Sequence, residues 1–265
     1  MTNNPLTYSK QSLVEKLKAI SRKGFILNAR QGNDGGIGNT LEDLLGINEN
    51  NLPIPNAAEW ELKTQHINTS SLTTLFHVEP SPRALRFVPQ ILLPKYGWAH
   101  QKAGKRYTKG EMSFRQTIHG KSRSDRGFGV VIDRDARKVL ISFDSASVSP
   151  HHKDWLESVK KRVGLGELSP QPYWGFDDLE HKAGTKLPNT FYVQAEVKRE
   201  SGKEYYKYSK VTMLEKFSFN GFLKAIEDAN ILVDFDARSG HNHGTKFRLR
   251  QNYLPVLYEK VTAIL

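Results

Sequence analysis

The chain has 265 residues, 38% of them hydrophobic, which is enough for one large or two small domains with a buried core. Its 39 Lys and Arg exceed its 28 Asp and Glu, and the formal charge of +11 favours polyanionic partners such as nucleic acids. The absence of cysteine excludes disulfide scaffolds, cysteine nucleophiles and cysteine-ligated metal centres. The polar N-terminus and the lack of a long apolar run predict a cytoplasmic protein without a signal peptide or membrane span.

The N-terminal part of the chain is predicted to contain two helices and one strand. Ser12–Lys23 has apolar residues at helical spacing and a capping-box pattern at its start. A polar, glycine-rich turn is expected at Gln31–Asn39, and Thr40 then caps a short helix, which places Glu42 at a helix start. Apolar and polar residues alternate through Ala58–Gln65, which is typical of a half-buried strand.

The remaining elements are two hairpins, two helices and a connection. The segment 164–188 is rich in Gly and Pro, and we expect it to connect two lobes. The segment 236–250 is expected to be a polar loop that ends in a basic strand at 245–250. The predicted hairpins pair 128–132 with 139–143 and 191–197 with 205–213, and the helices cover 154–163 and about 220–230.

Most of the excess positive charge lies between Arg83 and Arg126, where eleven Lys or Arg face two acids. These charges are scattered among Gly, Tyr and Ser without the pattern of a groove-reading helix, so they favour phosphate contacts over base contacts. An exposed solubilising surface is the alternative. Within this stretch residues 113–116 are predicted to form a strand that enters a loop, which would let Arg115 approach a binding cleft.

The triplet Glu61-Leu62-Lys63 is the main catalytic candidate. On a strand, residues 61 and 63 point to the same face while residue 62 points into the core. In a phosphodiester nuclease such a carboxylate holds Mg²⁺, and the lysine steers or stabilises the attacking hydroxide. Two other triplets have the same spacing, but Glu196-Val197-Lys198 is expected to be a solvated cross-strand pair, and Glu180-His181-Lys182 lies in the connection with no strand to fix it.

Two further groups of polar residues were considered as sites. The segment 236–250 concentrates side chains that can read base edges, since Arg and Lys bind guanine, Asn pairs with adenine and neutral His donates or accepts. Phosphate contact, or no contact, is the alternative for these residues. His151 and His152 have no third ligand at metal-binding spacing, so a surface pair is expected.

Several ordered blocks of the sequence resemble one nuclease family. They are Gly38–Glu42, Leu45–Ile47, Pro55-Asn56, Trp60–Thr64, Ser70–His77, Glu79–Arg83 and Gly240–Arg248. This set is similar to the MutH-like branch of the PD-(D/E)XK nucleases, and most closely to the MvaI/BcnI type II restriction endonucleases.

The resemblance implies an α/β (α+β) fold with a mixed sheet flanked by helices, and two lobes around a DNA cleft. We expect residues 1–145 to form the catalytic lobe with the basic segment and residues 146–265 to form the DNA-recognition lobe. The implied activity is Mg²⁺-dependent, sequence-specific hydrolysis of double-stranded DNA by a monomer that nicks the two strands in turn. A cognate DNA methyltransferase would be a functional companion rather than a binding partner.

The resemblance also assigns the site residues. The catalytic set is Glu42, Asn56, Glu61 and Lys63, and the metal ligands are Asn56, Glu61 and Leu62. The DNA-binding set is nominated from side-chain chemistry together with this analogy, and it is Arg83, Arg115, Arg238, His241, Asn242, His243, Lys246 and Arg248.

Asn56 departs from the family pattern, which has Asp at this position. An amide offers one neutral oxygen to a hard cation, so metal affinity and rate should both fall. Either the enzyme tolerates Asn56, or Glu49 or Glu59 replaces it, or the chain is a weakened variant. There are two alternatives to a restriction enzyme. The resemblance also leaves a MutH-type mismatch-repair nickase, and the departure at Asn56 favours a catalytically impaired DNA-binding protein with a nuclease fold.

Overall fold

The computed structural model describes residues 8–30, 32, 35–47, 60–67 and 71–265. The chain forms two compact units, each built from separate segments. Unit 1 contains Met1–Ser71, Gly184–Ser218 and Leu254–Leu265, and unit 2 contains Leu72–Ala183 and Phe219–Tyr253. The lobes expected from the sequence were contiguous, and their boundary at residue 145 falls inside a strand, β7 (Lys138–Val148).

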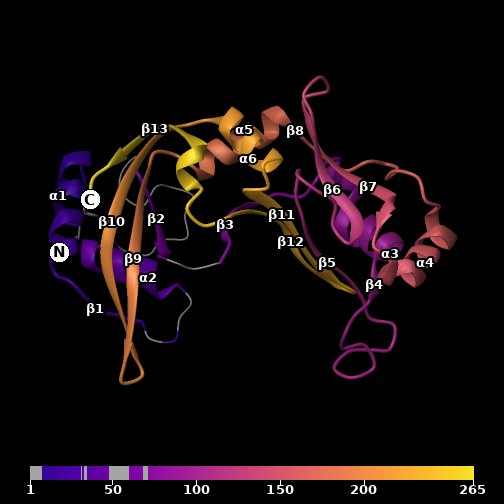
Figure 1. Ribbon diagram of the computed structural model, residues 1–265, viewed down its shortest axis with the longest axis horizontal. Helices are drawn as coiled ribbons and strands as arrows, with labels where there is room; N and C mark the ends of the chain where they lie inside the picture. Colours follow the sequence, from indigo (N-terminus) through magenta and orange to yellow (C-terminus); the bar gives the residue numbers. More distant parts are fainter. Residues whose placement is uncertain (1–7, 31, 33–34, 48–59, 68–70) are drawn as a thin grey trace. The chain divides into compact units, whose positions relative to one another are not determined.

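Unit 1 is a mixed sheet with two helices beside it (Figure 1). Strand β2 (Glu61–His66) runs parallel to β9, and the other pairs are antiparallel. The sheet order is β1 (Ile26–Leu27), β10 (Lys203–Phe217), β9 (Thr190–Glu200) and β2, with β13 (Tyr258–Ala263) also paired to β10. The helices are α1 (Lys10–Arg22) and α2 (Gly36–Leu45), and the short 3₁₀ helix η4 covers Leu254–Leu257.

The core of unit 1 joins both helices to one face of this sheet. Leu13 and Leu17 of α1 and Leu41 of α2 are almost fully buried, together with Leu62 of β2 and Phe191 of β9. Because α2 and β2 share this apolar cluster, their relative position is fixed by burial of hydrophobic surface.

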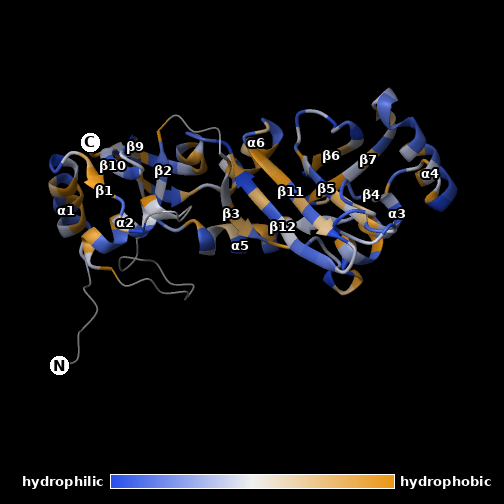
Figure 2. Cartoon of the chain, turned by 90° about the horizontal axis from the view of Figure 1, so that it is seen from below, coloured by the Kyte–Doolittle hydropathy of each residue, from blue (hydrophilic) through white to orange (hydrophobic). Residues whose placement is uncertain are grey.

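Unit 2 contains two further sheets. One has the order β3 (Thr73–His77), β12 (His241–Leu249), β11 (Ile231–Arg238), β5 (Met112–Ile118) and β4 (Trp98–Ala99), and the other has β6 (Arg126–Asp133), β7 and β8 (Tyr173–Gly175). Both hydrophilic and hydrophobic residues occur along β11 and β12 (Figure 2). The helices of this part of the chain are η1 (Arg83–Leu85), η2 (Val88–Leu92), α3 (Leu93–Tyr96), η3 (Pro150–His152), α4 (Lys153–Val163), α5 (Phe176–Lys186) and α6 (Phe219–Glu227).

Most predicted elements are present. The helices predicted at 12–23, at 154–163 and at about 220–230 correspond to α1, α4 and α6, and both hairpins form, as β6–β7 and β9–β10. The strand predicted at 58–65 is β2, although residues 58 and 59 lie outside the described part of the chain. Among the described residues the structure contains no helix long and apolar enough to cross a membrane.

The predicted helix caps were wrong. Ser9, not Ser12, caps α1, because the Ser9 hydroxyl accepts the Ser12 backbone N–H. Helix α2 begins at Gly36, inside the expected turn, so Thr40 lies within the helix and Glu42 lies in its last turn. The Thr40 hydroxyl instead accepts the Ala29 N–H, which ties the helix to the preceding segment.

Two predicted irregular segments are regular structure. The connection predicted at 164–188 contains β8 and all of α5, so Glu180-His181-Lys182 lies on a helix. The loop at 236–250 is the hairpin of β11 and β12, which turns at Ser239-Gly240. Gly240 has a φ of +68°, a conformation that glycine adopts without steric cost.

Candidate functional site

Glu61 and Lys63 form a close ion pair on β2. The Lys63 Nζ lies 2.6 Å from Glu61 Oε1, and the side chains are 27% and 18% exposed for Lys63 and Glu61. Leu62, between them, is buried in the core. The prediction that the acid and the amine share one face of a strand is confirmed.

The partners of this pair come from β9 and β13, where sequence patterns gave no signal. In the parallel register Glu61 lies opposite Thr190 and Lys63 lies opposite Tyr192, and both partners are buried. The Thr190 and Tyr258 hydroxyls lie 2.9 Å apart. Burial raises the pKa of Tyr258, and the charge of Glu61 raises it further, so this phenol stays protonated near the carboxylate.

The main chain of β2 leaves oxygens available beside Glu61. The Glu61 N–H donates to the Asn189 carbonyl, and the Ile67 N–H donates to the Ala195 carbonyl. The backbone N–H and C=O groups of the odd-numbered residues of the strand therefore point toward β9, and those of the even-numbered residues point away from it. Among the described strands β2 is an edge of the sheet, and the carbonyl of Leu62 therefore points away from β9. A carboxylate oxygen and a main-chain carbonyl at one strand edge are oxygen ligands of the kind that Mg²⁺ prefers.

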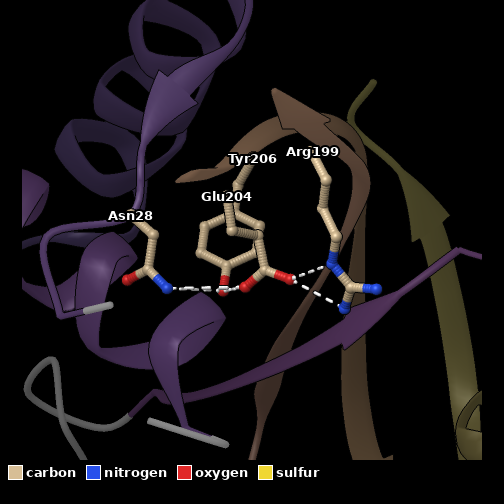
Figure 3. Close-up of polar contacts among 4 residues, drawn as sticks. All are labelled: Asn28, Arg199, Glu204 and Tyr206. Atoms are coloured by element: carbon tan, nitrogen blue, oxygen red, sulfur yellow. Dashed lines mark hydrogen bonds and ion pairs between the residues drawn. The ribbon is translucent and has the colours of Figure 1, made fainter. Parts of the chain in front are cut away.

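Glu42 lies on α2, which a buried polar cluster fixes to the sheet (Figure 3). Asn28 Nδ2 donates to the Tyr206 hydroxyl at 3.0 Å, and Tyr206 in turn donates to Glu204. The Asn28 Oδ1 accepts the Thr40 hydroxyl of α2 at 3.3 Å. This cluster joins the start of α2 to β10 and so sets the orientation of the helix that carries Glu42.

Asn56 and the alternative acids Glu49 and Glu59 lie outside the described residues. Their roles, and the departure at Asn56, stay predictions. The other two acid-x-Lys triplets differ from the β2 triplet: Glu196 pairs across the hairpin with Lys207 at 3.2 Å, as expected for a solvated pair. Glu180 and Lys182 lie on α5, where residues two apart do not share a face.

The second candidate site is one face of the β3–β12–β11–β5–β4 sheet. Residues directly opposite in antiparallel strands lie on the same face. The register places Lys246 beside Asp234 and His77, Arg115 beside Asp236, and His241 beside Arg238. The face formed by His77, Ser113, Arg115, Thr117, Asp234, Asp236, Arg238, His241, Lys246 and Arg248 is called the polar face of unit 2 below.

Carboxylates hold the arginines of this face. Arg238 Nη1 lies 3.1 Å from Oε1 of Glu111, whose side chain is 8% exposed. Arg248 pairs with Asp234 at 3.4 Å, and Arg115 pairs with Asp236 at 3.4 Å. Each guanidinium has five N–H donors, so one carboxylate orients it without using all of them.

A bulge in β12 lies next to Asn242 and His241, two residues predicted to read bases, which point to opposite faces of the sheet. The register shift between Phe235 and Ala237 places Asn242 opposite buried Ala237, so Asn242 lies on the face opposite to His241. Its amide donates to Glu79 at 3.4 Å and accepts the Gly244 N–H at 3.1 Å. His243 remains beside His241, with ring centroids 4.2 Å apart. Asn242 is thus held in contacts within the protein, whereas both histidines are exposed.

The basic stretch 83–126 is not uniformly available to phosphates. Arg83 is exposed in η1. Arg126 stacks over Trp98 at 3.8 Å, and burial lowers the pKa of Arg126.

On the polar face of unit 2, burial and the neighbouring Lys246 lower the pKa of His77, which favours the neutral imidazole.

The expectation that His151 and His152 have no third ligand is wrong. Asp125 lies beside them, and the ligand atoms of the three residues are all within 4.8 Å of one another. The signal was missed because Asp125 is distant in sequence and is brought close by the pairing of β6 with β7.

Comparison with known proteins identifies relatives over nearly the whole chain. The model of the MvaI/BcnI restriction endonuclease family matches residues 14–258. The restriction endonuclease MvaI in complex with its cognate DNA substrate is similar, with a TM-score of 0.70 and 26% identity over 98% of this chain and 100% of that chain. MvaI in the absence of DNA gives a TM-score of 0.59 at the same identity and coverage. The comparison with curated proteins found no match.

Proposed function

Because this chain belongs to the MvaI/BcnI restriction endonuclease family, we propose that it cuts double-stranded DNA at a short recognition sequence. The proposed reaction is Mg²⁺-dependent hydrolysis of phosphodiester bonds. The observation that carries the proposal is the ion pair of Glu61 and Lys63 on β2. We assign catalysis to unit 1 and DNA recognition to unit 2, in place of lobes divided at residue 145.

The residues of β2 fit the proposed chemistry. Glu61 and the carbonyl of Leu62 would hold Mg²⁺ through oxygen ligands, and Asn56 is the further ligand that the family pattern implies. The chemistry that Mg²⁺ would supply there is polarisation of the scissile phosphate and a lower pKa for a water. Lys63, held 2.6 Å from Glu61, supplies a positive charge for the developing negative charge and orients the attacking oxygen. Glu42 is proposed to orient this group from α2.

The polar face of unit 2 supports recognition of base edges. Glu111 and Asp234 orient Arg238 and Arg248, and oriented guanidinium groups suit the bidentate geometry of guanine. Arg115 is largely exposed beside Asp236 and completes the arginines of this face. His241, His243 and Lys246 complete the proposed reading set. Asn242 is proposed to shape the β12 bulge rather than to touch a base, and Arg83 to contact phosphate.

Cleavage of a sequenced supercoiled plasmid with Mg²⁺, followed by mapping of the ends, tests the proposal. We expect defined ends, with nicked circles accumulating before linear DNA because one active site cuts the strands in turn. Glu61→Gln and Lys63→Ala should each lower the rate about 100-fold or more. The matched controls are Glu196→Gln and Lys198→Ala, which alter a triplet of the same spacing and should cut like the parent chain.

The alternatives give different results in the same assay. A mismatch-repair nickase would stop at nicked circles and require an activating protein to cut. A catalytically impaired DNA-binding protein would bind DNA without cutting, and Asn56→Asp would then restore cleavage. Equal rates for Lys63→Ala and Lys198→Ala would refute the assignment of the active site to β2.

A further inference from the structure

The start of β6 and the helical turn before α4 are held together by the backbone. Ser149 N–H donates to the Asp125 carbonyl at 2.9 Å, and the next residue, Arg126, pairs with Val148. His152 N–H donates back to the Ser149 carbonyl at 2.9 Å. Side chains of Asp125, His151 and His152 are therefore presented from two segments whose relative position is fixed.

The three side chains have the geometry of an incomplete coordination shell. His151 Nε2 lies 3.8 Å from Asp125 Oδ2, and the rings of His151 and His152 have centroids 4.0 Å apart. Ligand atoms about 2.0 to 2.2 Å from a tetrahedral ion are roughly 3.3 to 3.6 Å from one another. Small side-chain rotations would therefore bring these three ligand atoms to coordination distance of one ion.

A second contact fixes the orientation of one imidazole. The Ser149 hydroxyl lies 2.7 Å from His151 Nδ1, which leaves Nε2 facing Asp125. A hydrogen bond to the other ring nitrogen is the usual partner of a metal-bound histidine, because it fixes both the tautomer and the ring. The Ser149 contact thus points to a ligand at Nε2 independently of the spacing of the cluster.

We propose that Asp125, His151 and His152 form a binding site for a divalent transition-metal ion, with Zn²⁺ as the best fit. Two imidazoles and one carboxylate are a common zinc donor set, whereas Mg²⁺ prefers oxygen ligands alone. The site lies within unit 2, and its chemistry is distinct from that of the oxygen ligands on β2. A bound ion would link the start of β6 to η3, and water would fill the remaining positions of this exposed site.

The test uses the full chain without a histidine tag and stripped of metal. Zn²⁺ is titrated by calorimetry, and Co²⁺ is titrated as a spectroscopic probe whose visible bands report nitrogen and oxygen ligands. We expect one tightly bound ion per chain, apart from any weaker binding to the oxygen ligands on β2, and displacement of Co²⁺ by Zn²⁺. Binding of this ion should be at least about 10-fold weaker in Asp125→Asn and in the double variant His151→Ala/His152→Ala. His181→Ala, which removes an exposed histidine of α5, is the matched control and should bind like the parent chain.

Thermal unfolding gives a second measurement. Because an ion that binds only the folded state stabilises it by mass action, Zn²⁺ should raise the Tm of the parent chain and of His181→Ala but not of the double variant. Absence of saturable Zn²⁺ binding in the parent chain would overturn the proposal. The same stoichiometry and affinity in the double variant would also overturn it.

Discussion

A single added methyl group at Gly36 should show how strongly the polar cluster of unit 1 fixes α2. Gly36 is the first residue of the helix, and its burial places it against Asn28 and Tyr206. A Cβ at this position would lie 2.6 Å from Asn28 Nδ2 and 2.8 Å from the Tyr206 hydroxyl. Asn28 and Tyr206 are 2% and 1% exposed, so neither side chain has free space into which to move.

The cost follows from the contacts that must change. Alanine gains up to about 1 kcal/mol over glycine in a helix. Overpacking of a buried site costs about 1 to 3 kcal/mol, and displacement of the Asn28 amide breaks its bonds to Tyr206 and Thr40 at about 1 kcal/mol each. We therefore expect Gly36→Ala to lower the free energy of unfolding by about 2 to 4 kcal/mol.

Urea denaturation measures this change as a lower midpoint with an unchanged slope, and hydrogen exchange of the 36–45 amides localises it to α2. The matched control is Gly184→Ala in α5, where a Cβ would meet only Phe217 at 4.0 Å and should leave stability equal or higher. If Gly36→Ala is as stable as Gly184→Ala, the polar cluster does not fix the helix. Because α2 carries Glu42, the proposed function adds that Gly36→Ala should slow cleavage more than it weakens DNA binding.

Three further predictions concern charge and metal. Glu204 accepts a hydrogen bond from Tyr206 and pairs with Arg199 at 3.1 Å (Figure 3), and the Tyr206 bond lowers the pKa of Glu204 more than Arg199 does. The Glu204 carboxylate therefore contributes its full stability above its unfolded pKa, and this contribution is lost as the pH falls through its folded pKa. Glu204→Gln should flatten the fall in Tm between about pH 5 and about pH 3. Glu79 accepts hydrogen bonds from the Thr245 N–H at 3.0 Å and from the Thr245 hydroxyl at 3.1 Å. Glu79→Gln should therefore distort the β12 bulge and reduce the preference for specific over competitor DNA, measured by gel-shift competition. An unchanged preference would show that the bulge takes no part in recognition. Removal of Mg²⁺ with EDTA should abolish plasmid cleavage while DNA binding persists, and cleavage without any divalent ion would contradict the assignment of metal ligands on β2.

The sequence predicted the features that depend on residues close together in the chain. The pairing of Glu61 with Lys63 follows from the two-residue period of a strand, and α1 follows from the spacing of Leu13, Leu17 and Ile20. Helix α2 was misplaced because its N-terminal glycines look like a turn. The helix forms there because Ile37 and Leu41 bury apolar surface and because Asn28 holds Thr40, and both contributions come from tertiary contacts.

Non-local pairing accounts for what the sequence did not predict. Thr190 and Tyr192 join the candidate active site only through the parallel register of β2 with β9, across more than a hundred residues of chain. Asp125 joins His151 and His152 only through the β6–β7 hairpin. No local pattern encodes either register, because each depends on which strands become neighbours.

On the polar face of unit 2, strand register decides which arginines lie beside carboxylates. From the sequence alone, phosphate contact was the alternative to base reading for Arg238 and Arg248. The sheet places each of them beside a carboxylate of another strand or strand end. Such pairs reduce net attraction for a polyanion, and they cost side-chain entropy before any ligand arrives. These ion pairs would not increase the affinity of a surface that attracts DNA by charge alone. They do increase the affinity of a surface that must hold guanidinium donors at fixed positions. The loss of side-chain entropy then occurs during folding and does not oppose binding. The ion pairs of this face therefore favour sequence reading over phosphate attraction as its role.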